Sequence, residues 1–188
     1  MTTNNKIELM APAGNFESLQ AALDNGCDSV YFGVEQLNMR ARASVNFTMD
    51  DLAEIAKRCE AKNVRSYLTL NTIIYDHDLS VVKTLINKAK EANITAVIAS
   101  DQAVIAMARS VGMEVHISTQ LNVTNIETIK FYSLFADTMV LSRELSLRQV
   151  KKITEQIEKE QIKGPNGNLV EIEIFGHGAL CMAVSGKC

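Results

Sequence analysis

The 188-residue sequence is poor in the features that mark disordered, secreted or membrane-spanning chains. It contains only two prolines and no low-complexity tract, which argues against a disordered tail. No apolar run approaches the roughly 18 residues that a membrane span needs, and the opening letters MTTNNKIELM lack the apolar core of a signal peptide. We therefore expect a cytoplasmic, globular protein without membrane contact.

A strong charge of either sign is also lacking. The formal net charge is −3 and the sequence pI is about 5.7, so no global field favours nucleic acid or an anionic membrane. A local basic groove can coexist with an acidic surface, so RNA is not excluded as a substrate. Hydrophobic residues make up 47% and charged residues 22% of the chain, which predicts one domain with a sizeable core.

Cysteine is scarce, and the four cysteines are not expected to form a disulfide framework in a reducing compartment. Cys27 and Cys59 lie in segments with apolar periodicity and are predicted to be core residues. Cys181 and Cys188 are separated by six residues in a glycine-containing loop near His177. That spacing alone is a weak metal signal.

Short β-rich runs alternate with amphipathic helical stretches along the chain. The expected strands are Ile7–Ala11, Ser29–Gly33, Ser66–Leu70, Ala96–Ser100, Glu114–Thr119, Thr138–Ser142 and Glu171–Phe175. The expected helices are Phe16–Asn25, Met49–Lys62, Asp78–Ala92, Gln102–Val111, Asn125–Leu134 and Leu147–Glu160. Asn15, Thr48 and Ser146 are expected N-caps, and Gly112 is a stop signal. The alternation is typical of βαβ units and a parallel sheet.

The even spacing of these units favours an α/β fold of the TIM-barrel-like (β/α) type over a doubly wound sheet. Such a barrel needs eight strands and about 250 residues, whereas this sequence offers about seven strands. We therefore expect residues 1–188 to form a single, incomplete (β/α) barrel-like domain, the N-terminal part of a longer protein. Its open strand edges predict self-association.

Polar side chains gather where the expected strands end, which is where (β/α) barrels carry their chemistry. Arg40 and Arg42 follow the second strand and suit a carboxylate or phosphate, with a solvated loop as the alternative. Asn71 follows the third strand, and His77, slightly later, is predicted to be a surface loop residue. Asp101 follows the fourth strand, unless it only caps the next helix.

The fifth expected strand carries the clearest signal. Two-residue alternation places His116, Ser118 and Gln120 on one face. Three polar residues on an otherwise buried strand are costly unless they are hydrogen-bonded or used, so we predict a functional site here, with a hydrogen-bonded interior histidine as the alternative. Arg143 and Glu144 follow the sixth strand at the rim, where a mutual ion pair is the alternative.

Taken together, these segments resemble peptidase family U32, the collagenase-like proteases. The terminal signature of that family has the form Glu-x-Phe-x-x-Gly-[Ser/Ala]-aliphatic-Cys-x4-Gly-x-Cys. This chain meets the signature with Glu173, Phe175, Gly178, Ala179, Leu180, Cys181, Gly186 and Cys188. The segments ELMAPAGN, GCDSVYFG, LNMRARASVNFT, LTLNT, HISTQLNVTN and VLSRELS are also similar to the family. The resemblance therefore covers essentially the whole sequence.

The resemblance implies a TIM-barrel-like catalytic domain and, in better understood members, oxygen-independent hydroxylation of RNA, such as the tRNA wobble uridine with prephenate as oxygen source. It also implies a 4Fe–4S cluster, for which Cys181 and Cys188 would supply two of the four thiolates. The expected catalytic residues are His116, Arg143, Glu144 and His177, and the expected substrate-binding residues are Arg40, Arg42, Asn71, Asp101, Ser118, Gln120 and Asn122.

Two alternatives to an RNA hydroxylase stay open. A collagenase-like peptidase has less support, because the sequence contains neither an H-E-x-x-H zinc motif nor a G-x-S-x-G serine motif. A nucleophilic pair of Cys181 and His177 is conceivable, although it leaves Cys188 without a role. The other alternative is a non-catalytic scaffold subunit. The expected partner of the hydroxylase is tRNA or another RNA.

Overall fold

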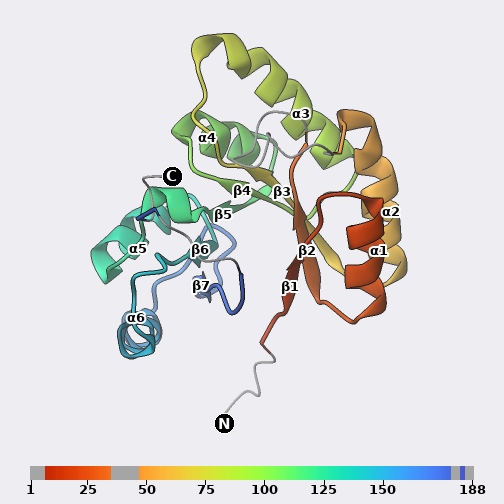
Figure 1. Ribbon diagram of the computed structural model, residues 1–188. Helices are drawn as coiled ribbons and strands as arrows, with labels where there is room; N and C mark the ends of the chain where they lie inside the picture. Colours follow the sequence, from red (N-terminus) through yellow and green to blue (C-terminus); the bar gives the residue numbers. More distant parts are fainter. Residues whose placement is uncertain (1–6, 35–46, 179–182, 185–188) are drawn as a thin grey trace. The chain divides into compact units, whose positions relative to one another are not determined.

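The computed structural model describes residues 7–34, 47–178, 183 and 184 (Figure 1). These residues form two compact units. The first unit comprises the described residues up to Thr69 together with Ser80–Ala96, and the second comprises Leu70–Leu79 and the described residues from Val97 onward. Every predicted site residue that the structure describes belongs to the second unit.

The first unit is a parallel sheet with helices packed along it. Its elements are β1 (Met10–Pro12), α1 (Phe16–Asp24), β2 (Ser29–Phe32), the 3₁₀ helix η1 (Met49–Asp51), α2 (Leu52–Ala61), β3 (Arg65–Leu70) and α3 (Leu79–Glu91), except for the end residues Leu70 and Leu79, which belong to the second unit. The strands pair in parallel, with Ala11 opposite Val30 and Val30 opposite Ser66. Leu19, Ile55 and Leu85 on the three helices are fully buried, because each helix turns its apolar stripe to the sheet.

The helix starts in the first unit follow the expected capping chemistry. Asn15 Oδ1 accepts a hydrogen bond from the Ser18 backbone N–H at 2.8 Å, and Ser18 Oγ accepts one from the Asn15 N–H at 3.1 Å. Thr48 and Asp51 form the same reciprocal capping box at η1. These contacts satisfy backbone donors that a helix cannot pair internally, so the predicted caps at Asn15 and Thr48 are confirmed.

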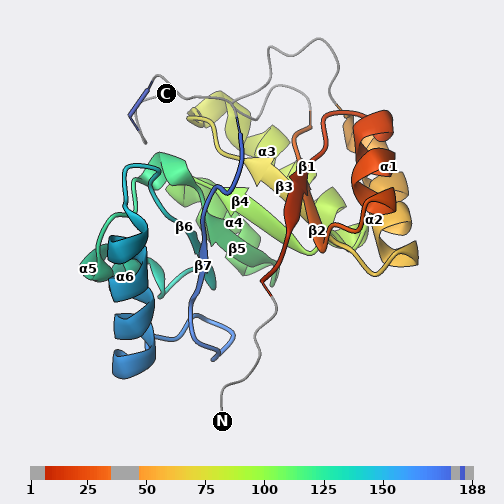
Figure 2. The ribbon, with the colours of Figure 1, turned by 60° about the horizontal axis from the view of Figure 1, so that its bottom comes forward.

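The second unit continues the alternation of strand and helix. Its elements are the 3₁₀ helix η2 (Asp76–Asp78), β4 (Ala96–Ala99), α4 (Gln102–Ser110), β5 (Glu114–Ile117), the 3₁₀ helix η3 (Thr119–Leu121), α5 (Ile126–Tyr132), β6 (Thr138–Val140), α6 (Leu147–Glu160) and β7 (Glu171–Glu173). β5, β6 and β7 are parallel neighbours (Figure 2). The Lys130 ammonium lies 2.7 Å from a Glu160 carboxylate oxygen and joins α5 to α6, which lie side by side in both views.

The predicted fold class is confirmed: seven parallel strands alternate with helices in the described part of the chain, as in a TIM-barrel-like (β/α) fold. Within each unit the strand order follows the sequence. Every strand except β3 is shorter than expected, and β3 begins one residue earlier than expected, at Arg65. β5 ends at Ile117 because the next residue, Ser118, caps the 3₁₀ helix η3 instead of extending the strand. Helix α4 stops just before Gly112, which takes the expected left-handed conformation with φ of 69°.

None of the helices in the described segments is both long and apolar enough to cross a membrane. Self-association through strand edges stays a prediction.

Cys27 and Cys59 are buried in the first unit, as predicted for core residues. Burial in apolar surroundings disfavours the thiolate, so it raises the pKa of Cys27 and raises the pKa of Cys59 to about 11. Such thiols are poor nucleophiles and poor ligands at neutral pH. Both residues are therefore assigned to packing.

We expect neither of these thiols to react with a disulfide reagent in the folded protein at pH 8. The measurement is a thiol titration of a Cys181→Ser/Cys188→Ser variant, with and without denaturant. Two thiols should react, and only after unfolding, because both are buried in the folded protein and burial raises their pKa values. Rapid reaction of both thiols in native buffer would contradict their placement in the core.

Candidate functional site

The second unit carries a group of polar side chains on one face of β5 and β7. His116 on β5 is in register with Thr138 on β6, and Thr138 is in register with Glu171 on β7. Neighbours in register present their side chains to the same face, and so do alternate residues along one strand. Glu114, His116 and Glu173 therefore share a face. We call the side chains of Glu114, His116, Ser118 and Glu173 the polar face.

His116 is the central side chain of the polar face and is only 3% exposed. Its Nε2 lies 3.1 Å from Oε1 of Glu114, and its Nδ1 lies 3.9 Å from Oε2 of Glu173. A protonated imidazole carries a positive charge, and burying such a charge without a partner is unfavourable. The carboxylates of Glu114 and Glu173 provide negative charge next to the ring. Each of the two ring nitrogens of His116 thus faces a carboxylate oxygen.

Ser118 lies at the end of β5 next to His116 and is also buried. Its hydroxyl oxygen accepts weak hydrogen bonds from Asn71 Nδ2 and from the Gln120 backbone N–H, both at 3.4 Å. Asn71, which follows β3, and Ser118, which follows β5, are thus in contact. Gln120 does not continue the strand, because it lies in η3; the predicted alternation of three polar side chains along one strand is wrong at this residue.

Asn122 and Ser142 form a second polar pair after the ends of β5 and β6. Ser142 Oγ donates a hydrogen bond to Asn122 Oδ1 at 2.9 Å, and the Ser142 backbone N–H donates to the Val123 carbonyl at 3.0 Å. Asn122 has φ of 54° and ψ of 48°, a left-handed conformation that asparagine tolerates better than most residues. The bond to Ser142 orients the exposed amide of Asn122.

The remaining predicted residues of the second unit have different surroundings. Asp101 caps α4, accepting a hydrogen bond from the Ala103 N–H at 2.8 Å, which is the structural role weighed against substrate binding. The Arg143 guanidinium carbon lies 4.8 Å from the centre of the Phe175 ring, a cation–π contact. Glu144 and His177 are exposed. His77 is exposed, as predicted, but it lies in the 3₁₀ helix η2 and not in a loop, and its ring stacks on Tyr75.

Arg40, Arg42, Cys181 and Cys188 lie outside the described residues. Within those residues, no group of three or more His, Cys, Asp or Glu side chains could hold a metal ion. Cys27 and Cys59 are buried with raised pKa values and do not suit an iron–sulfur cluster, whose ligands are thiolates. The part of the chain that the structure describes therefore does not by itself fit a 4Fe–4S cluster.

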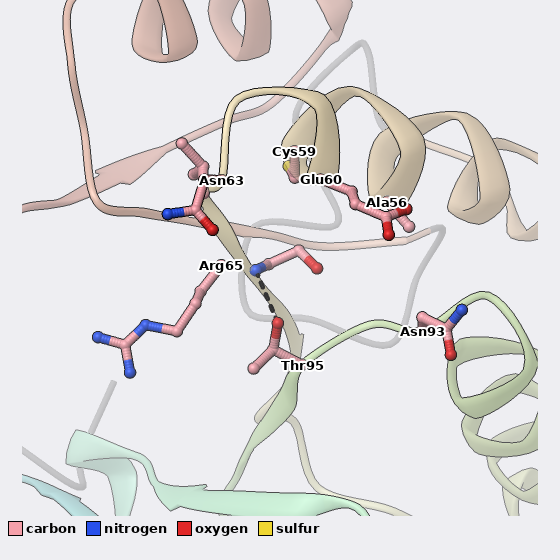
Figure 3. A pocket seen from close by; sticks show the side chains of 9 residues that line it. Ala56, Cys59, Glu60, Asn63, Arg65, Asn93 and Thr95 are labelled. Atoms are coloured by element: carbon pink, nitrogen blue, oxygen red, sulfur yellow. Dashed lines mark hydrogen bonds between the residues drawn. The ribbon is translucent and has the colours of Figure 1, made fainter.

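A cavity of about 260 Å³ lies in the first unit, and none of the predicted site residues that the structure describes lines it. It is lined by Ala56, Cys59, Glu60, Asn63, Val64, Arg65, Ser66, Asn93 and Thr95 (Figure 3). These residues surround the starts of β3 and β4, where (β/α) barrels typically carry stability, not chemistry. Arg65 is paired with Glu8. We therefore place the candidate site on the polar face and not in this cavity.

Sequence reasoning missed Glu114 and Glu173 as site residues. Glu114 lies two residues before His116 in the same strand, so alternation alone could have placed it on the same face. Glu173 was recognised only as a signature residue, because its approach to His116 depends on the register of β5, β6 and β7.

Comparison with known proteins adds a family and several relatives. The sequence model of Peptidase family U32 matches residues 14–188. A protein named "Collagenase" from Porphyromonas gingivalis is 56% identical over 184 residues, which are 98% of this chain and 44% of that protein. A "tRNA hydroxylation protein P1" from Bacillus subtilis is 32% identical over 186 residues, covering 97% of this chain and 41% of the relative. The chain thus spans less than half the length of these relatives.

A solved U32 peptidase structure has the same fold. It aligns with a TM-score of 0.67 at 13% sequence identity, covering 93% of this chain and 69% of the solved chain. At this identity the likeness concerns the fold alone.

Proposed function

Because this chain belongs to peptidase family U32, we propose that its polar face is part of the catalytic site of an enzyme and that His116 exchanges a proton with the substrate. The observation that carries the proposal is the buried imidazole of His116, 3.1 Å from the Glu114 carboxylate and 3.9 Å from that of Glu173. Histidine is the side chain that enzymes use most often as a general acid–base group.

Peptide hydrolysis is the first candidate reaction, since a relative that is 56% identical to this chain over 184 residues is named a collagenase. This reverses the order expected from the sequence, where RNA hydroxylation came first. In this reaction His116 takes a proton from water, and the water oxygen attacks the peptide carbonyl carbon. The C–N bond then breaks, and His116 returns the proton to the leaving amine.

RNA hydroxylation is the second candidate, because a relative at 32% identity is named a tRNA hydroxylation protein. For this reaction the family resemblance implies a 4Fe–4S cluster with Cys181 and Cys188 among its ligands, and prephenate as oxygen donor. The cluster would supply electron-transfer chemistry. The chain's own contribution would be the polar face and the arginines Arg40, Arg42 and Arg143, which suit a phosphate or a dicarboxylate.

The two candidates differ in product, so mass spectrometry of products tests them. The full-length product of the gene that encodes this chain is incubated with denatured collagen, and new peptide N-termini are sought. In parallel, tRNA nucleosides are compared between cells with and without the gene. New N-termini support the peptidase, and loss of a hydroxylated uridine supports the hydroxylase. A negative result in both assays would overturn an enzymatic role of either kind and favour a scaffold.

A further inference from the structure

We propose that Glu114 is a positioning residue that keeps one proton of His116 fixed on Nε2, so that the proton exchanged by this histidine is the one on Nδ1, which faces Glu173. This inference rests on the proposed function only where it concerns catalysis. The protonation pattern of the ring follows from the geometry of the polar face and holds whatever reaction the protein performs.

The two carboxylates do not approach the imidazole equally. Glu114 Oε1 lies 3.1 Å from Nε2, which is within the normal range for a hydrogen bond between nitrogen and oxygen. Glu173 Oε2 lies 3.9 Å from Nδ1, which is within the range of an ion pair but beyond that of a direct hydrogen bond. The closer carboxylate therefore has the stronger hold on the ring.

The nitrogen that keeps its proton in a neutral imidazole is set by the hydrogen bond of each nitrogen. A carboxylate only accepts hydrogen bonds, so contact with Glu114 requires a proton on Nε2. A lone pair at that nitrogen would face the carboxylate oxygen at 3.1 Å and repel it. Nδ1 then carries the lone pair in the neutral ring, and the second proton when the ring is charged.

The position of Glu114 suits a permanent anchor. It lies two residues before His116 on the same strand, so the pleat of β5 fixes the two side chains on one face. Glu173 comes from β7 and reaches the ring across β6. Glu114, on the same strand as His116, thus holds the ring through Nε2. Glu173, from β7, faces Nδ1, the nitrogen at which the proton is exchanged.

Nitrogen-15 NMR of the imidazole rings tests this assignment on the 188-residue chain, which contains only three histidines, His77, His116 and His177. At a pH where the rings are neutral, His116 should show a proton on Nε2 as its dominant form. In a Glu114→Gln variant this dominance should be lost, because an amide can donate to Nε2 as readily as it accepts. Glu171→Gln, at an exposed carboxylate at the start of the same β7, should leave the His116 spectrum unchanged.

A wild-type spectrum with the neutral-state proton on Nδ1 would overturn the proposal, and this result does not depend on whether any variant folds. An unchanged Nε2-protonated form in Glu114→Gln would overturn it as well. For catalysis, Glu114→Gln should lower kcat about 10- to 100-fold with little change in KM. If His116→Gln retains full activity, the proposed function fails while the NMR result on the ring still stands.

Discussion

Replacing His116 with Gln should lower the turnover of the full-length protein by about 100- to 10,000-fold, the range typical for loss of a general acid–base group. The amide of Gln can still hydrogen-bond to Glu114, which lies 3.1 Å from the imidazole, but it cannot take up a proton near neutral pH. The melting temperature should therefore change by only a few degrees, about what a loss of 1 kcal/mol produces. The measurement is steady-state kinetics on whichever product the wild-type protein forms, with thermal unfolding of the same samples.

His77→Gln is the matched control for this prediction. His77 is also a histidine of the second unit, but it lies in η2, and its side chain is 80% exposed and stacks on Tyr75. The same change at this residue should leave activity within about twofold of wild type, because an exposed histidine outside the polar face contributes no proton transfer there. An equal loss of activity in His77→Gln and His116→Gln would contradict a catalytic role specific to His116.

Replacing Gly164 with Ala should destabilise the second unit by about 1–3 kcal/mol, the usual cost of overpacking a filled site. A Cβ atom at Gly164 would lie 2.5 Å from Oδ1 of Asp137 and 2.9 Å from its Cα. Asp137 cannot move away easily, since it is buried and its Oδ1 accepts a hydrogen bond from the Asn166 N–H at 2.9 Å. Its carbonyl also accepts one from the Glu171 N–H at 2.9 Å, at the start of β7.

Thermal unfolding checks this prediction, with an expected fall of about 2–4 °C for each kcal/mol. Gly14→Ala is the control, because a Cβ atom there would meet nothing within 4 Å and the backbone is not left-handed. It should unfold within about 0.5 kcal/mol of wild type, as surface substitutions do. Equal melting temperatures for Gly164→Ala and the wild type would show that the loop before β7 is less tightly packed on Asp137 than the structure indicates.

The fold could be predicted from sequence because its determinants are local. Helix α6 has the predicted bounds, Leu147–Glu160, since Ser146 and Gln149 form a capping box at its start and Ile153 and Ile157 are buried one turn apart. Strand ends were less predictable. β6 was expected to reach Ser142 but ends at Val140, because strand limits depend on which partner residues pair and not on propensity alone.

The site could be predicted only in part, because it depends on contacts between strands. His116 was recognisable as a polar residue on an apolar strand, and its burial is confirmed. The approach of Glu173 to His116 could not be foreseen from periodicity, since it requires the register of three strands. Asp101 shows the opposite case. Its position at a strand end suggested substrate binding, but the structure gives it the local role of a helix cap.

The most direct test of an enzymatic site at His116 is a single reaction mixture with both substrate classes. Full-length wild-type protein and the His116→Gln variant are each incubated with denatured collagen and with tRNA lacking the hydroxylated uridine, together with prephenate. Mass spectrometry then follows new peptide N-termini and hydroxylated nucleosides. The proposal predicts that the wild type forms one of these products and that the variant forms less than about one hundredth as much. A product formed equally by both proteins would contradict a catalytic role for His116.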